Sequence, residues 1–194
     1  MIAIIDYNAG NIQSVEFAME RLGVDFITTN DKDLIRKADK VIFPGVGEAK
    51  NTMEFLKAQG LDVFIKELKQ PVLGICLGMQ LMCKHSEEGD VDDLGIFDTN
   101  VKLFIPQSGE KVPHMGWNTI TDVKGALFQG DLENQYVYFV HSYYAEPCEH
   151  TVATTNYILP YSSALQKDNF YAAQFHPEKS GDIGEQILRN FINL

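Results

Sequence analysis

Short apolar runs alternate with segments of helical periodicity through the first half of the chain. The apolar runs predict buried strands at residues 2–6, 26–28, 41–43 and 72–75. Apolar residues at helical spacing predict helices at residues 12–22, 33–38, 52–59, 61–69 and 77–85. Strands that alternate with helices in this way are typical of a parallel sheet with helices on both faces.

The second half has a different pattern, because β-rich runs follow one another with only turn residues between them. These runs predict strands at residues 100–104, 119–123, 136–140, 151–155 and 171–175, and a helix at 183–192 closes the chain. Such a series suggests antiparallel strands that extend the sheet. We therefore expect one α/β domain over residues 1–194, with a central mixed, mostly parallel, flavodoxin-like sheet flanked by helices.

A cysteine lies between two glycines directly after the fourth apolar run. Gly74 and Gly78 stand two residues before and two residues after Cys76. This spacing lets a strand turn sharply into a helix and leaves the intervening side chain exposed, as in the nucleophile elbows that carry serine. Cysteine is intrinsically nucleophilic, and a helix start behind it favours the thiolate. For this short motif alone, a buried structural thiol remains the alternative.

His176 stands out among the five histidines as a partner for Cys76. It follows a strand-like run and precedes Pro177, which restrains it toward an extended conformation. In an extended segment His176 and Glu178 project to the same side, so the carboxylate can orient the imidazole while the other ring nitrogen faces the thiol. An isolated His-x-Glu is more often a surface ion pair. Coupled to the cysteine elbow, it predicts a nucleophile, a base and an orienting group.

Backbone amides at two strand ends are candidates for stabilising a developing oxyanion. The amide of Leu77 directly follows the nucleophile, and a second donor could come from residues 45–47, where two glycines flank Val46. Ligands of parallel sheets bind beyond the carboxyl ends of the strands, so both segments should face the same crevice. An ordinary glycine-rich turn is the alternative for residues 45–47 alone.

Composition and charge narrow the choice of partner. The chain of 194 residues carries a formal net charge of −11, which argues against a general binder of nucleic acid or of anionic membranes. Three cysteines without Cys-x-x-Cys spacing suggest neither a disulfide framework nor a zinc site, so we expect no metal. Neither a phosphate loop nor a dinucleotide fingerprint occurs, and no cofactor is expected. The absence of a signal-peptide pattern and of a long apolar stretch favours the cytoplasm.

Residues 74–80 together with His176, Pro177 and Glu178 resemble the class I, triad-type glutamine amidotransferases. The resemblance covers nearly the whole chain in length and in the order of its motifs. It implies hydrolysis of glutamine through a γ-glutamyl thioester on Cys76, with His176 as general base and then acid, and with Glu178 orienting His176. It also implies that the ammonia passes to a synthase partner and is not lost to water.

The same resemblance assigns roles to further residues. It implies that Val46 supplies an oxyanion donor beside Leu77. The residues that it implies for substrate binding are Gly47, Gln80, Ser142 and Tyr143. Those that it implies for the partner interface are Pro44, Trp117 and Asn118. For His141 we expect a structural role, because one histidine suffices as the base.

Residues 6–11, 14–15, 113–118 and 141–143 form an ordered set that is similar to the glutaminase subunits of imidazole glycerol phosphate synthases. This similarity implies a heterodimer with a (β/α)8-barrel cyclase subunit, which makes imidazole glycerol phosphate and aminoimidazole carboxamide ribotide in histidine biosynthesis. Ammonia would cross the interface near residues 44–47. We also expect low activity of the free subunit, because the Val46 peptide would point its amide away from the site until the loaded partner binds.

Three alternatives remain open at the level of sequence. One is an amidotransferase subunit that serves anthranilate or pyridoxal phosphate synthesis, which residues 113–118 fit less well. Another is a stand-alone cysteine hydrolase acting on γ-glutamyl compounds, which turnover without a partner would favour. The last is a non-catalytic subunit that keeps only the fold, against which the presence of Cys76, His176 and Glu178 argues.

Overall fold

Five parallel strands form the half of the sheet that carries the predicted nucleophile. The structure is a computed structural model that describes residues 1–7 and 12–194, so residues 8–11 of the predicted motif at 6–11 lie outside the described residues. In sheet order these strands are β2 (Phe26–Thr29), β1 (Ile2–Ile5), β3 (Lys40–Phe43), β4 (Val72–Ile75) and β13 (Phe170–Ala173). Every neighbouring pair among them is parallel. This order, with β1 between β2 and β3, is that of flavodoxin-like sheets.

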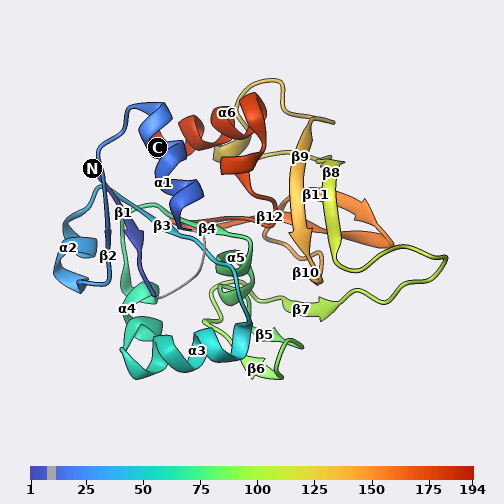
Figure 1. The fold of residues 1–194 in the computed structure, drawn as a ribbon, viewed down its shortest axis with the longest axis horizontal. Coiled ribbons are helices and arrows are strands. Elements are labelled where there is room, and N and C mark those ends of the chain that lie inside the picture. Colours follow the sequence, from blue (N-terminus) through green and yellow to red (C-terminus); the bar gives the residue numbers. More distant parts are fainter. Residues whose placement is uncertain (8–11) are drawn as a thin grey trace.

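Beyond β13 the same sheet continues mainly with antiparallel pairs. In sheet order these strands are β12 (Leu159–Lys167), β10 (Tyr143–Ala145), β7 (Asn100–Leu103), β5 (His85–Ser86) and β6 (Val91–Asp92), and β11 (Thr151–Tyr157) pairs with β12. Only the pair of β5 with β7 is parallel in this half. A separate ribbon of β8 (His114–Thr119) and β9 (Tyr136–His141) lies at the end of the molecule away from α2 (Figure 1).

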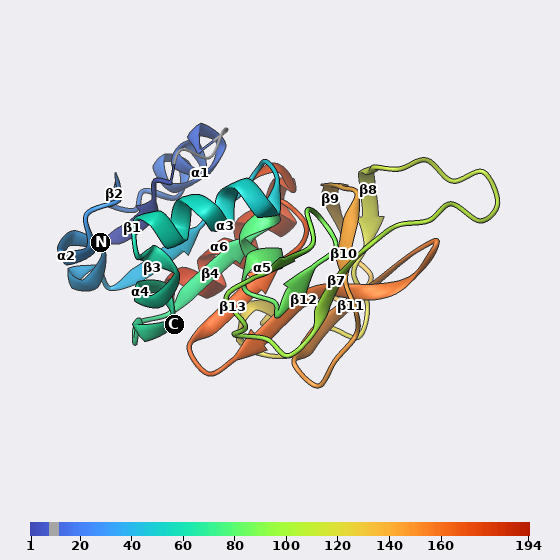
Figure 2. The ribbon, with the colours of Figure 1, turned by 90° about the horizontal axis from the view of Figure 1, so that it is seen from below.

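Helices cover both faces of the parallel half (Figure 2). One face packs against α1 (Gln13–Leu22) and α6 (Gly181–Ile192), and the other against α2 (Lys32–Lys37), α3 (Ala49–Ala58), α4 (Leu61–Glu67) and α5 (Leu77–Leu81). The alternation along β1 explains the two cores: Ile2 and Ile4 join the core with α1 and α6, whereas Ala3 and Ile5 join the other. Two short 3-10 helices, η1 (Ala126–Phe128) and η2 (Pro177–Lys179), complete the fold. The predicted α/β domain with a mixed sheet flanked by helices is confirmed.

The predicted helix at residues 77–85 is too long. Helix α5 ends at Leu81, and His85 lies in strand β5. The carbonyl of Met82 accepts hydrogen bonds from the amides of Ile96 and Phe97, both at 2.9 Å, and so cannot continue the helical ladder. Met82 and Cys83 are buried although they lie outside the helix. Their apolar side chains therefore extend the helical pattern of the sequence beyond the end of α5.

The pattern of the second half also departs from the structure in two places. The strand predicted at residues 119–123 is displaced, because β8 spans His114–Thr119 and Thr121 makes only an isolated bridge to Thr154. Residues 114–118 therefore belong to strand β8. The nine-residue strand β12 was not predicted at all. Glycine and asparagine within β8, and a central stretch of small polar residues in β12, weaken the usual strand signal.

Candidate active site

The turn from β4 into α5 has the geometry of a nucleophile elbow. Cys76 stands between the two elements with φ 53° and ψ −109°, a strained conformation for a residue with a side chain. Both flanking glycines are required by close contacts. A Cβ on Gly78 would lie 2.0 Å from the carbonyl oxygen of Phe43, and one on Gly74 would lie 2.9 Å from the carbonyl oxygen of Gly78. The sequence spacing therefore reflects a tight crossing of the strand, the helix and the neighbouring strand β3.

His176 and Glu178 form a buried, hydrogen-bonded pair. Nδ1 of His176 lies 2.7 Å from Oε1 of Glu178, and only 3% of each side chain is exposed. His176 is extended, with φ −97° and ψ 95°, as Pro177 predicts. The predicted reason for the contact is nevertheless wrong, because Glu178 does not continue an extended strand. It lies in the 3-10 helix η2, which turns its carboxylate back toward the imidazole.

The surroundings of His176 favour its protonated form. Burial lowers the pKa of this imidazole, but the nearby sulfur of Cys76 and then Glu178 outweigh that effect and raise the pKa to about 10. Nε2 of His176 is buried and has no hydrogen-bond partner among the described residues. With Nδ1 held by Glu178, Nε2 is the ring atom that remains free to exchange a proton with the sulfur or with a ligand.

A cavity of about 310 Å³ collects most of the predicted site residues. Those that line it are Val46, Gly47, Cys76, Leu77, Gln80, Ser142, Tyr143 and His176. Four residues that were not predicted for the site also line it: Glu88, Pro113, Val140 and His141. Glu178 supports His176 from behind. The predicted interface residues Pro44, Trp117 and Asn118 lie outside this lining.

The two predicted oxyanion donors lie close together, but one is engaged. The Leu77 amide donates to the carbonyl of Gly45 over 3.4 Å. Next to it, the hydroxyl of Tyr7 donates to the carbonyl of Pro44. Burial and the nearby Cys76 raise the pKa of Tyr7, which keeps this hydroxyl protonated as a donor. Residues 44–47 are thus tied to β1 and to the elbow, and the Leu77 amide faces a peptide oxygen in this state.

The backbone around Tyr143 is fixed by two side chains. Its carbonyl accepts from Nε2 of Gln80 at 2.9 Å and from Nδ1 of His141 at 2.7 Å. The other nitrogen of His141 lies 3.2 Å from Nδ1 of His114 and 3.3 Å from the hydroxyl of Tyr161. Burial lowers the pKa of His141 to about 3 and that of His114 to about 4, so both rings are neutral. The structural role expected for His141 is consistent with these contacts.

Comparison with known proteins identifies the family. The family model "Glutamine amidotransferase class-I" matches residues 3–194. The chain belongs to the class I glutamine amidotransferases. It is 64% identical over 194 residues to "Imidazole glycerol phosphate synthase subunit HisH" of Bacteroides fragilis, covering all of this chain and 99% of the relative. Proteins with the same name from Haemophilus influenzae and Colwellia psychrerythraea are 48% and 45% identical, covering 98% of this chain and 96% and 92% of theirs.

Solved structures share the fold of this amidotransferase at low sequence identity. A Thermoplasma acidophilum protein described as a GMP synthase subunit superimposes with a TM-score of 0.76 at 21% identity, covering 99% of this chain and 92% of that one. A structure described as a glutamine amidotransferase gives a TM-score of 0.75 at 17% identity, covering 100% and 98%. The elements that carry Cys76 and His176 therefore belong to an architecture that tolerates wide sequence divergence.

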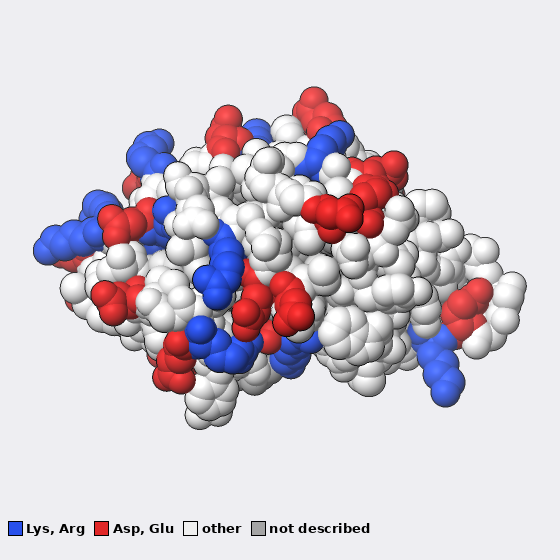
Figure 3. All heavy atoms as spheres, turned by 90° about the horizontal axis from the view of Figure 1, so that it is seen from above, with Lys and Arg blue, Asp and Glu red and all other residues white. Residues whose placement is uncertain are grey.

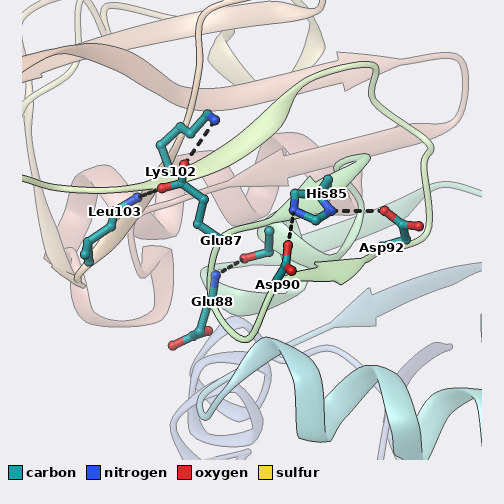
Figure 4. A network of polar contacts seen from close by, with 8 residues as sticks. His85, Glu87, Glu88, Asp90, Asp92, Lys102 and Leu103 are labelled. Carbon is teal, nitrogen blue, oxygen red and sulfur yellow. Dashed lines mark hydrogen bonds and ion pairs between the residues drawn. The ribbon is translucent and has the colours of Figure 1, made fainter.

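Glu88 is an acidic group in the cavity that sequence reasoning missed. Its carboxylate accepts from the amide of Ala49 at 2.9 Å, and burial raises its pKa. The loop that carries it is tied on both sides (Figure 4). Glu87 pairs with Lys102 at 3.0 Å, and His85 contacts Asp90 at 3.2 Å. Residues 87–90 are rich in acidic side chains without periodicity, and nothing in that pattern distinguishes the one that turns inward.

Two of the predicted interface residues, Trp117 and Asn118, lie on strand β8, whereas Pro44 is buried directly after β3. Trp117 is 56% exposed and packs edge-on against Tyr138, and Met115 and Tyr136 on the same ribbon are also exposed. Asn118 is half-buried and donates to the carbonyl of Asn156 at 3.1 Å. In the view of Figure 3, acidic and basic side chains are interspersed, and a broad uncharged area lies toward the β8 end.

Two further features of the described residues bear on the site. Within residues 1–7 and 12–194, His, Cys, Asp and Glu side chains form no group of three or more suited to hold a metal ion. In the same part of the chain, no helix is both long and apolar enough to cross a membrane.

Proposed function

We propose that this amidotransferase hydrolyses glutamine at Cys76 and delivers the ammonia to a (β/α)8-barrel cyclase subunit, with which it forms an imidazole glycerol phosphate synthase. The observation that carries the proposal is that the Cys76 elbow and His176 line one cavity, with Nδ1 of His176 held by Glu178 and Nε2 without a partner among the described residues. Identity of 45–64% over nearly full length to proteins named as subunits of this synthase supports the choice of pathway.

Formation of the thioester uses His176 as an acid. The Cys76 thiolate attacks the side-chain amide carbon of glutamine, and the carbonyl oxygen becomes an oxyanion. When the intermediate collapses, the carbon–nitrogen bond breaks and Nε2 of the His176 imidazolium donates its proton to the departing nitrogen, which leaves as ammonia. The carboxylate of Glu178, 2.7 Å from Nδ1, keeps Nε2 directed at the cavity throughout.

Hydrolysis of the thioester uses the same imidazole as a base. The neutral ring takes a proton from water, the resulting hydroxide attacks the thioester carbon, and the carbon–sulfur bond breaks to release glutamate. Cys76 leaves as a thiolate beside an imidazolium, which restores the starting state. The raised pKa of His176, about 10, describes this favourable charged pair.

Groups of the cavity match the free amino-acid end of glutamine. Glu88 places a half-buried carboxylate where an ammonium group can bind. The backbone at Ser142 and Tyr143 lines the same cavity and offers amides for a carboxylate. Gln80 uses Nε2 for its internal hydrogen bonds, so its Oε1 is the atom that can accept from the substrate beside Gly47.

Activation by the partner would open the oxyanion site. The Leu77 amide is occupied by the carbonyl of Gly45, so a shift of residues 44–47 is needed before it can serve an oxyanion. A rotation of the Val46 peptide in the same movement would supply the second donor. Pro44, Trp117 and Asn118 are proposed to contact the barrel subunit, which would couple its binding to this rearrangement.

The test is glutaminase activity with and without the barrel cyclase and its phosphoribulosyl carboxamide substrate. We expect the loaded complex to exceed the free subunit by at least roughly a hundredfold, the contribution of one oxyanion donor. In the complex, Cys76→Ala should abolish glutamine-dependent synthesis and leave synthesis from added ammonia intact. Full activity of the free protein on γ-glutamyl compounds would instead favour a stand-alone hydrolase, and failure of both syntheses would point to lost docking.

A further inference from the structure

A buried glutamine side chain lies against the sulfur of the nucleophile. Gln174 follows β13, is completely buried and is not part of the cavity lining. Its Nε2 lies 3.8 Å from Sγ of Cys76, and its Oε1 lies 2.9 Å from Nε2 of Gln80. The backbone amide of Gln174 donates to the carbonyl of Ser163 on β12 at 2.9 Å. Both the main chain and the side chain of this residue are therefore held in place.

The donors and acceptors around Gln174 determine which end of its amide faces the sulfur. The carbonyl of Tyr143 can only accept, so the Gln80 atom 2.9 Å from it must be the NH2 group. The same NH2 group also donates to the side chain of Gln174, so the accepting atom there must be the oxygen Oε1. The NH2 group of Gln174 is left pointing at Cys76. A flipped amide would oppose two NH2 groups and turn a second carbonyl oxygen toward the sulfur.

The two polar neighbours of the sulfur favour opposite protonation states. The carbonyl oxygen of Val140, 3.8 Å from Sγ, can accept from a thiol but repels a thiolate. The N–H of Gln174 donates to either form, and a hydrogen bond to a charged acceptor is roughly twice as strong as a neutral one. Without Gln174, the fixed dipole of Val140 would act on the sulfur unopposed and favour the thiol.

We propose that Gln174 is a catalytic hydrogen-bond donor that stabilises the Cys76 thiolate, and that Gln80 holds it in the donating orientation. The inference rests on the proposed role of Cys76 as the nucleophile. The hydrogen bond is made to the attacking thiolate, weakens when the sulfur lone pair enters the bond to carbon, and is restored when the thioester is hydrolysed. Gln80 thus serves both sides of the site, with Nε2 orienting Gln174 and Oε1 facing the cavity.

The test is the pH dependence of alkylation of Cys76 by iodoacetamide. Tandem mass spectrometry that localises the label by fragmentation separates Cys76 from Cys83, which lies seven residues further along the same peptide, and from Cys148. Gln174→Glu keeps the size and the acceptor for Gln80 but replaces the donor with an oxygen. We expect the midpoint of the alkylation profile to rise by about one pH unit, with roughly tenfold slower alkylation below it. An unchanged midpoint would overturn the proposal.

Other variants separate the hydrogen bond from general damage to the core. Gln174→Met removes the donor without adding charge and should shift the midpoint in the same direction by a smaller amount. Gln80→Met should also raise it, and adding Gln80→Met to Gln174→Met should change nothing more; additive shifts would refute the orienting role of Gln80. Ser163→Ala removes a buried hydroxyl that has no hydrogen-bond partner and should leave the midpoint unchanged. An equal shift in Ser163→Ala would refute a specific contact.

Alkylation needs no glutamine, so the proposed function and the role of Gln174 can fail separately. A shifted midpoint in a protein without glutaminase activity in the loaded complex would refute the function and support the contact between Gln174 and the sulfur. Glutaminase activity with identical alkylation profiles in the wild type and both Gln174 variants would support the function and refute the role of Gln174.

Discussion

Two buried histidines of this protein, His176 and His141, line the same cavity and have opposite charge preferences. His176 is paired with Glu178, and its pKa is raised to about 10. His141, which lines the same cavity, contacts His114, Tyr161 and the carbonyl of Tyr143, and its pKa is lowered to about 3. The degree of burial is similar, with 2% of His176 and 6% of His141 exposed. Burial alone therefore does not decide the charge of a histidine.

The charge of the neighbours explains the difference. The nearby sulfur of Cys76 and the carboxylate of Glu178 offset the cost of burying the imidazolium of His176. At His141, burial is the main cause of the lowered pKa, and the positive forms of His114 and His176 lower it further. The proposed mechanism uses the charged ring of His176 to exchange protons, whereas the neutral ring of His141 donates to the backbone carbonyl of Tyr143.

Replacing each ring by asparagine should give the largest contrast. His176→Asn removes the proton carrier, so we expect glutamine hydrolysis in the complex to fall by roughly 10⁴-fold or more. His141→Asn retains an NH2 group in the place of Nδ1, so it should lose less than about tenfold and mainly through a higher KM. Steady-state kinetics of both variants in the loaded complex measure the difference. Equal losses in kcat would abolish the distinction, and ammonia-dependent synthesis is the folding control.

A smaller effect is expected from neutralising the carboxylate that supports His176. Glu178→Gln can still accept from Nδ1 but no longer offsets the positive charge, so kcat should fall by roughly 10²- to 10⁴-fold. The KM for glutamine should change little, because Glu178 lies outside the cavity lining. Asp92→Asn is a matched control, since this exposed carboxylate contacts His85, and neither residue lines the cavity. If the rate of Glu178→Gln matches the wild type, Glu178 has no part in the mechanism.

The smallest expected effect lies in the pH dependence of stability. The folded pKa of His141, about 3, is below its ordinary value of 6.5, so the unfolded chain binds a proton first as the pH falls. The free energy of unfolding should therefore decrease below pH 6.5, by about 1.4 kcal/mol per pH unit for this residue. His176 has the opposite sign, because its contribution is complete below pH 6.5 and is lost as the pH rises through about 10.

Urea unfolding at a series of pH values can isolate these contributions. Between pH 6.5 and 5, His141→Phe should show a shallower fall in stability than the wild type, whatever constant offset the substitution adds. Between pH 7 and 10, His176→Asn should lose less stability than the wild type. Parallel curves in either range would mean that the corresponding histidine has the same pKa in the folded and unfolded chains.

The sequence predicts the parallel half of the molecule and the elbow at Cys76 better than it predicts the antiparallel half. Strands β1, β3 and β4 are buried on both faces, so their apolar runs are continuous and easily detected. The elbow can be recognised in the sequence because close backbone contacts require glycine at positions 74 and 78. Strand β12 is hidden because Ser162 and Ser163 are completely buried in it, which no local pattern signals.

Residues that act through long-range contacts were the hardest to predict. Glu88 looks like its acidic neighbours, and only the folded loop shows that it turns into the cavity. The sequence gives one indication of Gln174, because it is the polar residue within the apolar run that precedes His176. The contact of His176 with Glu178 was predicted, although through extended backbone and not through the 3-10 helix that forms it.

Because Gly78 lies so close to the end of β3, the turn at Cys76 cannot keep its shape outside this sheet. Only a hydrogen atom fits between the Gly78 α-carbon and the Phe43 carbonyl, so the nucleophile turn takes its shape from a strand that lies outside it in sequence. Grafting residues 72–81 onto another sheet would transfer the cysteine without the carbonyl of Phe43, the contact that shapes the turn. Any transplantation of this chemistry would have to carry β3 and β4 together.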